Sequence, residues 1–172
     1  MSEVEDLWLR PLRPDDEVAA HAAHDELAAE GFTFLLDRDR VASWPAYLRL
    51  LERQRLGRDP HPQRVPASFL VADVRGRLVG RVSIRYELDA FLEHEGGHIG
   101  YAVRPADRHQ GYAHRMLDLA VAYLHDRDER PVLVTCDDDN DVSAAIIEDC
   151  GGHLEDVRTR ADGTPVRRYW IG

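Results

Sequence analysis

Apolar positions recur along the chain at two spacings, which predict four helices and seven strands. Ala19, Ala23 and Leu27 follow one another every four residues, as expected for one face of a helix. Short apolar runs bounded by glycine, proline or aspartate are typical of strands. The predicted helices cover residues 14–31, 39–56, 112–124 and 142–150. The predicted strands cover residues 7–12, 68–74, 78–86, 98–103, 131–136, 154–160 and 166–171.

Turn residues join these elements into one domain. Gly76 lies between two strands at hairpin distance, and Asp162-Gly163 is a strong hairpin signal. The proline-bearing segment 57–66 and the acidic, glycine-ended segment 91–97 are expected to be loops. Strands and helices then alternate in an order that has no repeat and no linker. We expect a single domain over residues 1–172, of the α/β class, with a mixed sheet and helices on both faces.

The composition narrows the partners of this domain. Among 172 residues, 32 are acidic and 22 are basic, every one of them arginine, so the formal net charge is −10. This balance argues against nucleic acid, which needs a basic surface, and fits a cationic small molecule or basic peptide better. No apolar run approaches the ~20 residues of a membrane span, so no membrane is expected. Two thiols, Cys136 and Cys150, and an acidic N-terminus predict a reduced, cytoplasmic protein.

One stretch carries recognisable chemistry, and it begins where the predicted strand ends at Val103. A tight loop containing Gly111 follows, and a helix opens directly after it. Amides in such a loop and in the first helical turn have no internal partners, so they form an anion site suited to a pyrophosphate. Gly111 and the small Ala113 permit close approach of the backbone. Neither a Walker loop nor a dinucleotide fingerprint is present.

This stretch resembles the signature of the GNAT superfamily of acyl-CoA-dependent N-acetyltransferases, Gln/Arg-x-x-Gly-x-Gly/Ala, which Arg108, Gly111 and Ala113 satisfy. The preceding strand, residues 99–105, also has the family's form. Further along, residues 140–152 match its Asn-x-x-Ala/Ser helix that ends in glycine. The resemblance implies a mostly antiparallel sheet of about seven strands whose central strands splay apart. The ending at 167–171 is similar to a branch of predicted acetyltransferases.

The resemblance also implies a reaction and a set of binding residues. Acetyl-CoA would serve as co-substrate, without a metal, and its acetyl group would pass directly to a primary amine of a small molecule or peptide. The backbone of Ala102 and Val103 would pair with the pantetheine arm, and Asn140 and Ser143 would contact the cofactor from the other side. Family members are often dimers, so a homodimer is possible. The pyrophosphate would be bound by the amides of Arg108, His109, Gln110, Gly111, Tyr112 and Ala113.

The catalytic acid and base stay open at this level. The family often has a tyrosine seven residues after the asparagine, but Ile147 stands there in this chain. Tyr169, Tyr101 or solvent are the alternatives for protonating the leaving thiolate. The proposed base is His98, which alternation places on the same face as Gly100 and Ala102, with Glu95 or water as rivals. Because of Ile147, a non-catalytic acyl-CoA-binding module of the same fold is the alternative function.

The acidic segment before His98 invites two further interpretations. His94-Glu95-Gly96-Gly97-His98 spells the zinc-protease motif, but two adjacent glycines cost roughly 2 kcal/mol of helix propensity, so we reject zinc. Its carboxylates could instead attract a cationic acceptor amine, and a plain solvated loop is the competing interpretation. These carboxylates belong to Glu87, Asp89, Glu93 and Glu95.

Overall fold

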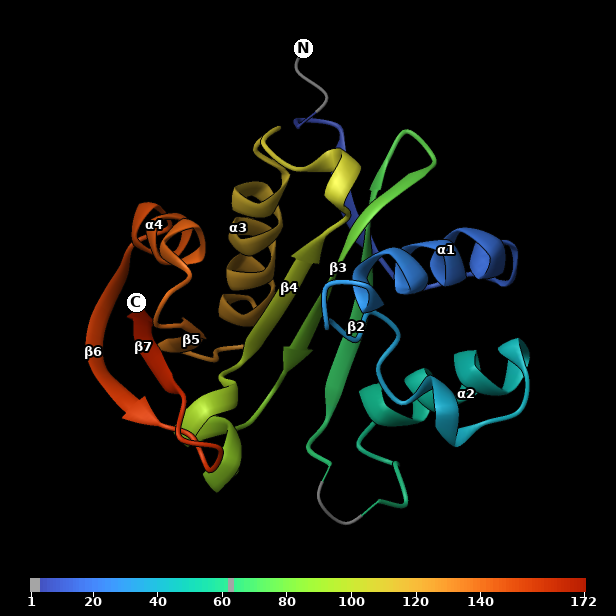
Figure 1. Cartoon of the computed structure of the whole chain (residues 1–172). Helices are drawn as coiled ribbons and strands as arrows, with labels where there is room; N and C mark the ends of the chain where they lie inside the picture. Colours follow the sequence, from blue (N-terminus) through green and yellow to red (C-terminus); the bar gives the residue numbers. More distant parts are fainter. Residues whose placement is uncertain (1–3, 62–63) are drawn as a thin grey trace.

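The computed structural model describes residues 4–61 and 64–172, and its centre is a seven-stranded sheet with the strand order β1-β2-β3-β4-β5-β7-β6 (Figure 1). Neighbouring strands are antiparallel except β4 and β5, which run parallel. This confirms the predicted fold class and a mostly antiparallel sheet. The strands are β1 (Leu7–Arg10), β2 (Ala67–Val74), β3 (Arg77–Arg85), β4 (Ile99–Val103), β5 (Val132–Asp137), β6 (Gly152–Thr159) and β7 (Pro165–Ile171).

Four helices cover the two faces of the sheet, and each face has its own apolar core (Figure 1). One core joins α1 and α2 to the middle of β2 and the start of β3. The other joins α3 and α4 to the opposite face of the central strands. The helices are α1 (Glu17–Ala28), α2 (Trp44–Arg55), α3 (Tyr112–His125) and α4 (Asp141–Asp149), and the short helical turns are η1 (Pro14–Asp16), η2 (Arg38–Arg40), η3 (Leu92–Gly96) and η4 (Pro105–Asp107).

Local chemistry explains where several elements begin and end. Helix α2 starts at Trp44 rather than near residue 39, because the Ser43 hydroxyl accepts a hydrogen bond from Ala46 N and caps the helix. Strand β1 ends at Arg10, directly before Pro11, which has no N–H for a ladder. The predicted acidic loop at 91–97 was wrong in part, since it contains the π-helical turn η3.

The sheet opens between β4 and β5. Only one pair of residues, Ile99 and Val134, is in register there, whereas β5 pairs with β7 over its whole length. The expected splay of the central strands is therefore confirmed. No helix in the described part of the chain has the length and apolar character needed to cross a bilayer.

Candidate active site

The turn from β4 into α3 makes a sharp change of direction. Gly111 is the N-cap of α3 with φ of +83°, and His109 has φ of +61°, so the chain makes two left-handed steps before the helix. The hydrogen bond from Arg115 N to Gly111 O, 3.2 Å, opens the helical ladder. The amides of Ala113 and His114 precede that bond, so the helix itself offers them no acceptor. A helix therefore opens directly after a glycine turn, as the sequence predicted.

The side chain of Arg108 fixes this turn to helix α1. Its Nε donates to Val103 O at 3.3 Å, and its guanidinium forms an ion pair with Glu30 at 2.6 Å. The hydrogen bond from Arg108 holds the pKa of Glu30 below its usual value. Arg104 makes a similar pair with Glu26 one turn earlier on α1. The side chain of Arg108 therefore positions the loop, while its neighbours offer backbone groups to a ligand.

The peptide groups of β4 divide between its two neighbours. Arg85 N donates to His98 O and Arg104 N donates to Val79 O, each at 2.8 Å, which fixes the ladder between β3 and β4. Because alternate residues of a strand direct their peptide groups to opposite sides, those of Ala102 face β3. Those of Tyr101 and Val103 face the opening toward β5. This geometry moves the expected backbone contact with pantetheine from Ala102 to Tyr101 and keeps it at Val103.

The start of α4 lies across this opening. Asn140 caps the helix, because its Oδ1 accepts a hydrogen bond from Ser143 N at 3.0 Å. The Tyr101 hydroxyl donates to Ser143 Oγ at 3.4 Å, so a β4 side chain reaches the first turn of α4. Burial raises the pKa of Tyr101, which keeps its hydroxyl protonated at neutral pH. Asn140, Ser143 and Tyr101 therefore meet in one place.

His98 joins β4 to β5 where the opening begins. Its backbone N donates to Leu133 O, and its Nδ1 accepts from Leu133 N, both at 2.8 Å. In the neutral ring the proton must then lie on Nε2, because Nδ1 is already an acceptor. Burial, and then the charge of Arg85, lower the pKa of His98. The ring nitrogen that could take a proton from an amine is thus occupied, which favours a positioning role for His98.

The other two predicted catalytic side chains have partners away from the amide turn. Glu95 forms an ion pair with Arg160 at 3.4 Å, and its backbone carbonyl accepts from the Thr135 hydroxyl. Tyr169 is 1% exposed, and its hydroxyl donates to Glu148 Oε1 at 3.2 Å. Burial raises the pKa of Tyr169. Neither side chain has a hydrogen bond or ion pair with His98 among the described residues.

Comparison with known proteins assigns this arrangement to a family. A family model described as an acetyltransferase (GNAT) domain matches residues 6–153. The chain belongs to the GNAT acetyltransferase family. The superfamily resemblance of the sequence is thereby confirmed.

Solved GNAT structures share the fold of this chain at low sequence identity. RimJ from Mycobacterium smegmatis, in complex with CoA-disulfide, has a TM-score of 0.71 and 21% identity, covering 96% of this chain and 81% of that one. RimL, the ribosomal L7/L12 alpha-N-protein acetyltransferase in complex with coenzyme A, has a TM-score of 0.68 and 19% identity. The match covers 96% of this chain and 93% of that one. The microcin C7 self-immunity acetyltransferase MccE, in complex with acetyl-CoA and AMP, has a TM-score of 0.65 and 15% identity. The match covers 96% of this chain and 92% of that one. A search of curated proteins gave no match.

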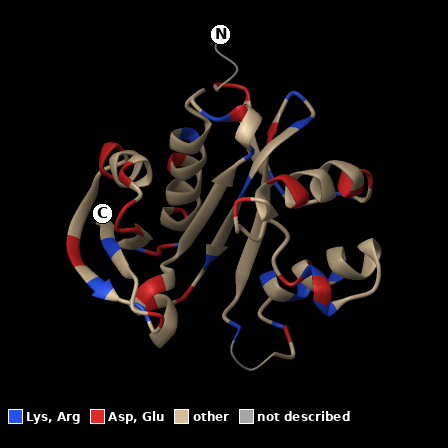
Figure 2. Ribbon diagram, viewed as in Figure 1, with Lys and Arg blue, Asp and Glu red and all other residues tan. Residues whose placement is uncertain are grey.

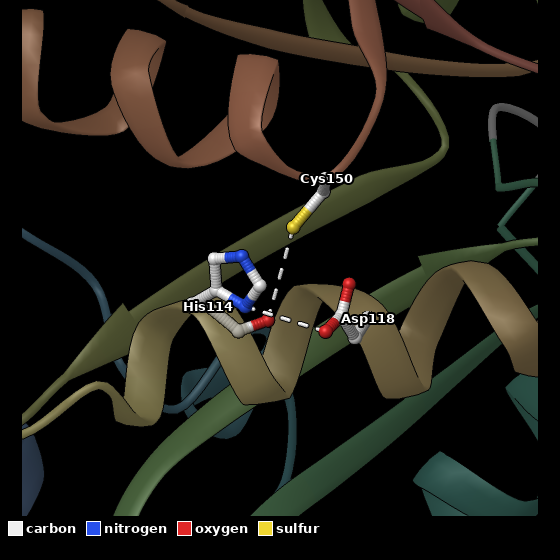
Figure 3. A group of neighbouring side chains, drawn as sticks. All are labelled: His114, Asp118 and Cys150. Carbon is white, nitrogen blue, oxygen red and sulfur yellow. Dashed lines mark hydrogen bonds and ion pairs between the residues drawn. The ribbon is translucent and has the colours of Figure 1, made fainter.

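The histidines of the zinc-like sequence have separate partners in this GNAT domain. His94 Nε2 lies 3.0 Å from Thr159 O, whereas His98 Nδ1 is bonded to β5. The group that could hold a metal among the described residues is instead His114, Asp118 and Cys150, drawn in Figure 3.

Figure 3 shows this group between two helices of the GNAT domain, with His114 and Asp118 on α3 and Cys150 just after α4. His114 Nδ1 lies 3.3 Å from Asp118 Oδ2, and the Cys150 thiol donates to the backbone O of His114 at 3.9 Å. Burial raises the pKa of Cys150 to about 12, so the metal-free thiol is protonated at neutral pH. The contacts favour a packing role for these residues.

Sequence reasoning missed two functional candidates of this GNAT domain, Arg81 and Arg85. Both lie on β3, on the face toward α1 and α2, next to Gly100 of β4. The available signal was an arginine at each end of a five-residue stretch inside an apolar strand. The predicted acidic segment is partly committed elsewhere, since Glu95 pairs with Arg160 and Asp89 Oδ1 accepts from Leu92 N. Figure 2 shows acidic residues in this segment and on α1 and α4.

Proposed function

We propose that this GNAT domain transfers an acetyl group from acetyl-CoA directly to a primary amine of a small molecule or peptide. The observation that carries the proposal is the opening between β4 and β5, which ends beside the left-handed glycine turn at the start of α3. A pyrophosphate needs donors without side-chain bulk, and Gly111 with the left-handed His109 supplies such a turn. The arm of a CoA molecule needs an open strand edge, and β4 has one. The residues present fit this co-substrate.

Binding would use backbone groups on one side and side chains on the other. Amides from His109 to Ala113 would hold the pyrophosphate, with the Arg108 side chain holding the turn in place. Tyr101 and Val103 would offer their peptide groups to the arm, as the exposed edge of a strand does to an added strand. Asn140 and Ser143 would close the site from α4. The low cysteine content adds a cytoplasmic location to this proposal, and the family resemblance adds a homodimer.

The reaction needs an oriented amine, a proton donor for the leaving sulfur and a proton acceptor for the amine. Acetyl-CoA supplies an acyl group activated as a thioester. The site orients a neutral amine against the acyl carbon, so that a C–N bond forms as the C–S bond breaks. The Tyr101 hydroxyl, held protonated by burial, would give its proton to the leaving sulfur. Water would remove the amine proton, since the Nδ1 atom of His98 is engaged with Leu133.

Thiol release that depends on an added amine tests the proposal. With acetyl-CoA saturating, we expect release of free thiol to require an amine from a panel of amino acids, peptides, polyamines and aminoglycosides. Tyr101→Phe should lower kcat by roughly 10²-fold or more, while the thermal shift given by acetyl-CoA stays. A protein that binds acetyl-CoA but releases no thiol with any amine would be the non-catalytic module. RimL acts on a protein α-amine by its name, so peptide N-termini belong in the panel.

A further inference from the structure

Two arginines of β3 converge beside the opening, on the face turned toward α1 and α2. Residues 81, 83 and 85 share this face by alternation, and Ser83 is the direct partner of Gly100 on β4. A Cβ atom placed on Gly100 would lie 3.4 Å from Nη1 of Arg85 and 3.8 Å from Nη1 of Arg81. Both guanidinium groups therefore flank the same glycine. A side chain at that position would compete with them for the space.

Neither guanidinium has a carboxylate partner among the described residues. Arg81, 4% exposed, donates to Thr33 O at 2.9 Å and to Gly100 O at 3.4 Å, and its buried Nε has no acceptor. Arg85 donates to Gly96 O at 3.3 Å. Burial, and then the charge of Arg85, lower the pKa of Arg81 to about 9. A buried and a half-buried positive charge that repel each other are costly unless something negative joins them.

Other buried arginines of this protein are paired with acids. Arg10 contacts Asp16 and Asp73 at 2.6 and 2.7 Å. Arg168 contacts two further carboxylates at 2.7 and 2.8 Å. Among the described residues, by contrast, no carboxylate forms an ion pair with Arg81 or Arg85, whose hydrogen bonds go to backbone oxygens.

A cavity of about 140 Å³ lies next to Arg85, between α2 and the ends of β2 and β3. Arg85 and Ser83 line it, and no hydrogen bond joins the Ser83 hydroxyl to another described residue. The acids that line it are Asp37 and Asp89. Asp37 is paired with Arg40 and Arg64, and Asp89 accepts from a backbone amide of η3. Burial, and then the charge of Arg64, lower the pKa of Arg85 to about 10, and Asp89 opposes this shift without forming an ion pair with Arg85.

We propose that the acceptor amine carries a carboxylate, and that Arg85, Arg81 and Ser83 bind it. Arginine suits this ligand, because its planar fork matches the two oxygens of a carboxylate. The proposal names the acceptor class of the site described above and so rests on the proposed function. The anion site lies beside Gly100, one residue from Ile99, where the opening toward β5 begins. A carboxylate bound there would hold the attached amine near the start of the opening.

Matched pairs of amines test the inference. Glycine is compared with glycinamide and β-alanine with its amide, and O-phosphoethanolamine with ethanolamine reports on phosphate. Acceptor-dependent thiol release gives kcat/KM for each. We expect each carboxylate to exceed its amide by at least about tenfold in the wild type. Arg85→Gln should remove that preference, whereas Arg49→Gln, at an exposed arginine of α2, is the control that should keep it.

A binding arm keeps the inference independent of turnover. With CoA present, N-acetylglycine should raise the Tm of wild type and Arg49→Gln more than N-acetylglycinamide does, and should lose this effect in Arg85→Gln. Should Arg85→Gln not fold, Arg85→Lys retains the charge without the fork, and we expect it to keep only part of the preference. Ligand-dependent shifts separate such loss of affinity from loss of fold.

The outcomes distinguish this inference from the proposed function. Equal use of carboxylates and amides, equal Tm shifts in wild type and Arg85→Gln, or a preference for the phosphate pair alone would each overturn it. Turnover with neutral or cationic amines and no such preference leaves the acetyltransferase standing without the carboxylate. Arg85-dependent binding of N-acetylglycine without turnover of any amine leaves the carboxylate site standing and removes the acetyltransferase.

Discussion

Replacing His98 by alanine and by asparagine separates a structural bond from a catalytic one. The imidazole accepts from the amide of Leu133, a fully buried residue. Alanine leaves that amide without an acceptor, which costs about 1–3 kcal/mol. For a domain of this size, the loss corresponds to a fall in Tm of roughly 2–12 °C. Asparagine can offer its amide oxygen instead, so we expect a smaller loss, measured by urea unfolding of all three proteins.

Activity and pH then decide between the two roles of His98. In a positioning role, His98→Asn keeps most of kcat and the same pH–rate profile, because no proton passes through the ring. In a base role, both variants lose roughly 10²-fold or more in kcat, and the acidic limb disappears. Asparagine restoring stability while turnover and the limb are both lost would refute our reasoning and return the base to His98.

The stability of the wild type should also depend on His98 protonation. Burial lowers the pKa of the folded-state imidazole below its ordinary 6.5. The unfolded chain therefore binds more protons near pH 6, so this contribution to stability is complete above pH ~6.5 and declines as the pH falls toward the folded pKa. The decline should be weaker in His98→Asn. Identical slopes in both proteins between pH 7 and 5 would contradict this assignment.

Three other substitutions test separate parts of the structure. Acetyl-CoA at 100 times its Kd should stabilise the fold by about 2.7 kcal/mol, and Gly111→Ala, at φ +83°, should abolish this stabilisation. Gly163→Ala, at φ +87°, introduces the same left-handed backbone strain away from the turn and should keep the stabilisation. Tyr169→Phe should leave kcat within a few fold in the thiol-release assay, because its hydroxyl is bonded to Glu148; a 10²-fold loss would make it the acid. Arg10→Met should cost about 3–5 kcal/mol in urea unfolding, since it strands two buried carboxylates; a change under about 1 kcal/mol would contradict the pairing.

Local patterns predicted the elements and the amide turn, because those depend on residues close in sequence. The left-handed Gly111 and the helix after it follow from the turn chemistry of residues 104–113. Alternation also placed the faces of β4 correctly. Tyr101 packs with the α3 and α4 core, and Ala102 with the α1 and α2 core.

The remaining features depend on register and on contacts far apart in the chain. The donor to the His98 ring, Leu133 N, is 35 residues away, and the parallel pairing of β4 with β5 brings them together. The side of β4 on which Ala102 directs its peptide groups depends on the ladder with β3, which no spacing reveals. The turn η3 formed despite its glycines, because the Asp89 carboxylate caps it and Gly97 ends it with φ of +66°. These local capping features outweighed intrinsic propensity there.

Net charge was the weakest guide to the acceptor, for a physical reason. A total of −10 suggests a cationic partner, but exposed acids act through water and salt, which screen them within about 10 Å. Many of the acids also form ion pairs with neighbouring arginines, as Glu30 does with Arg108 and Asp16 with Arg10. What a ligand meets in a cavity is the charge left unpaired and desolvated, where the effective dielectric is low. At Gly100 that charge is positive, so an acidic net charge is compatible with the carboxylate-bearing acceptor that we propose.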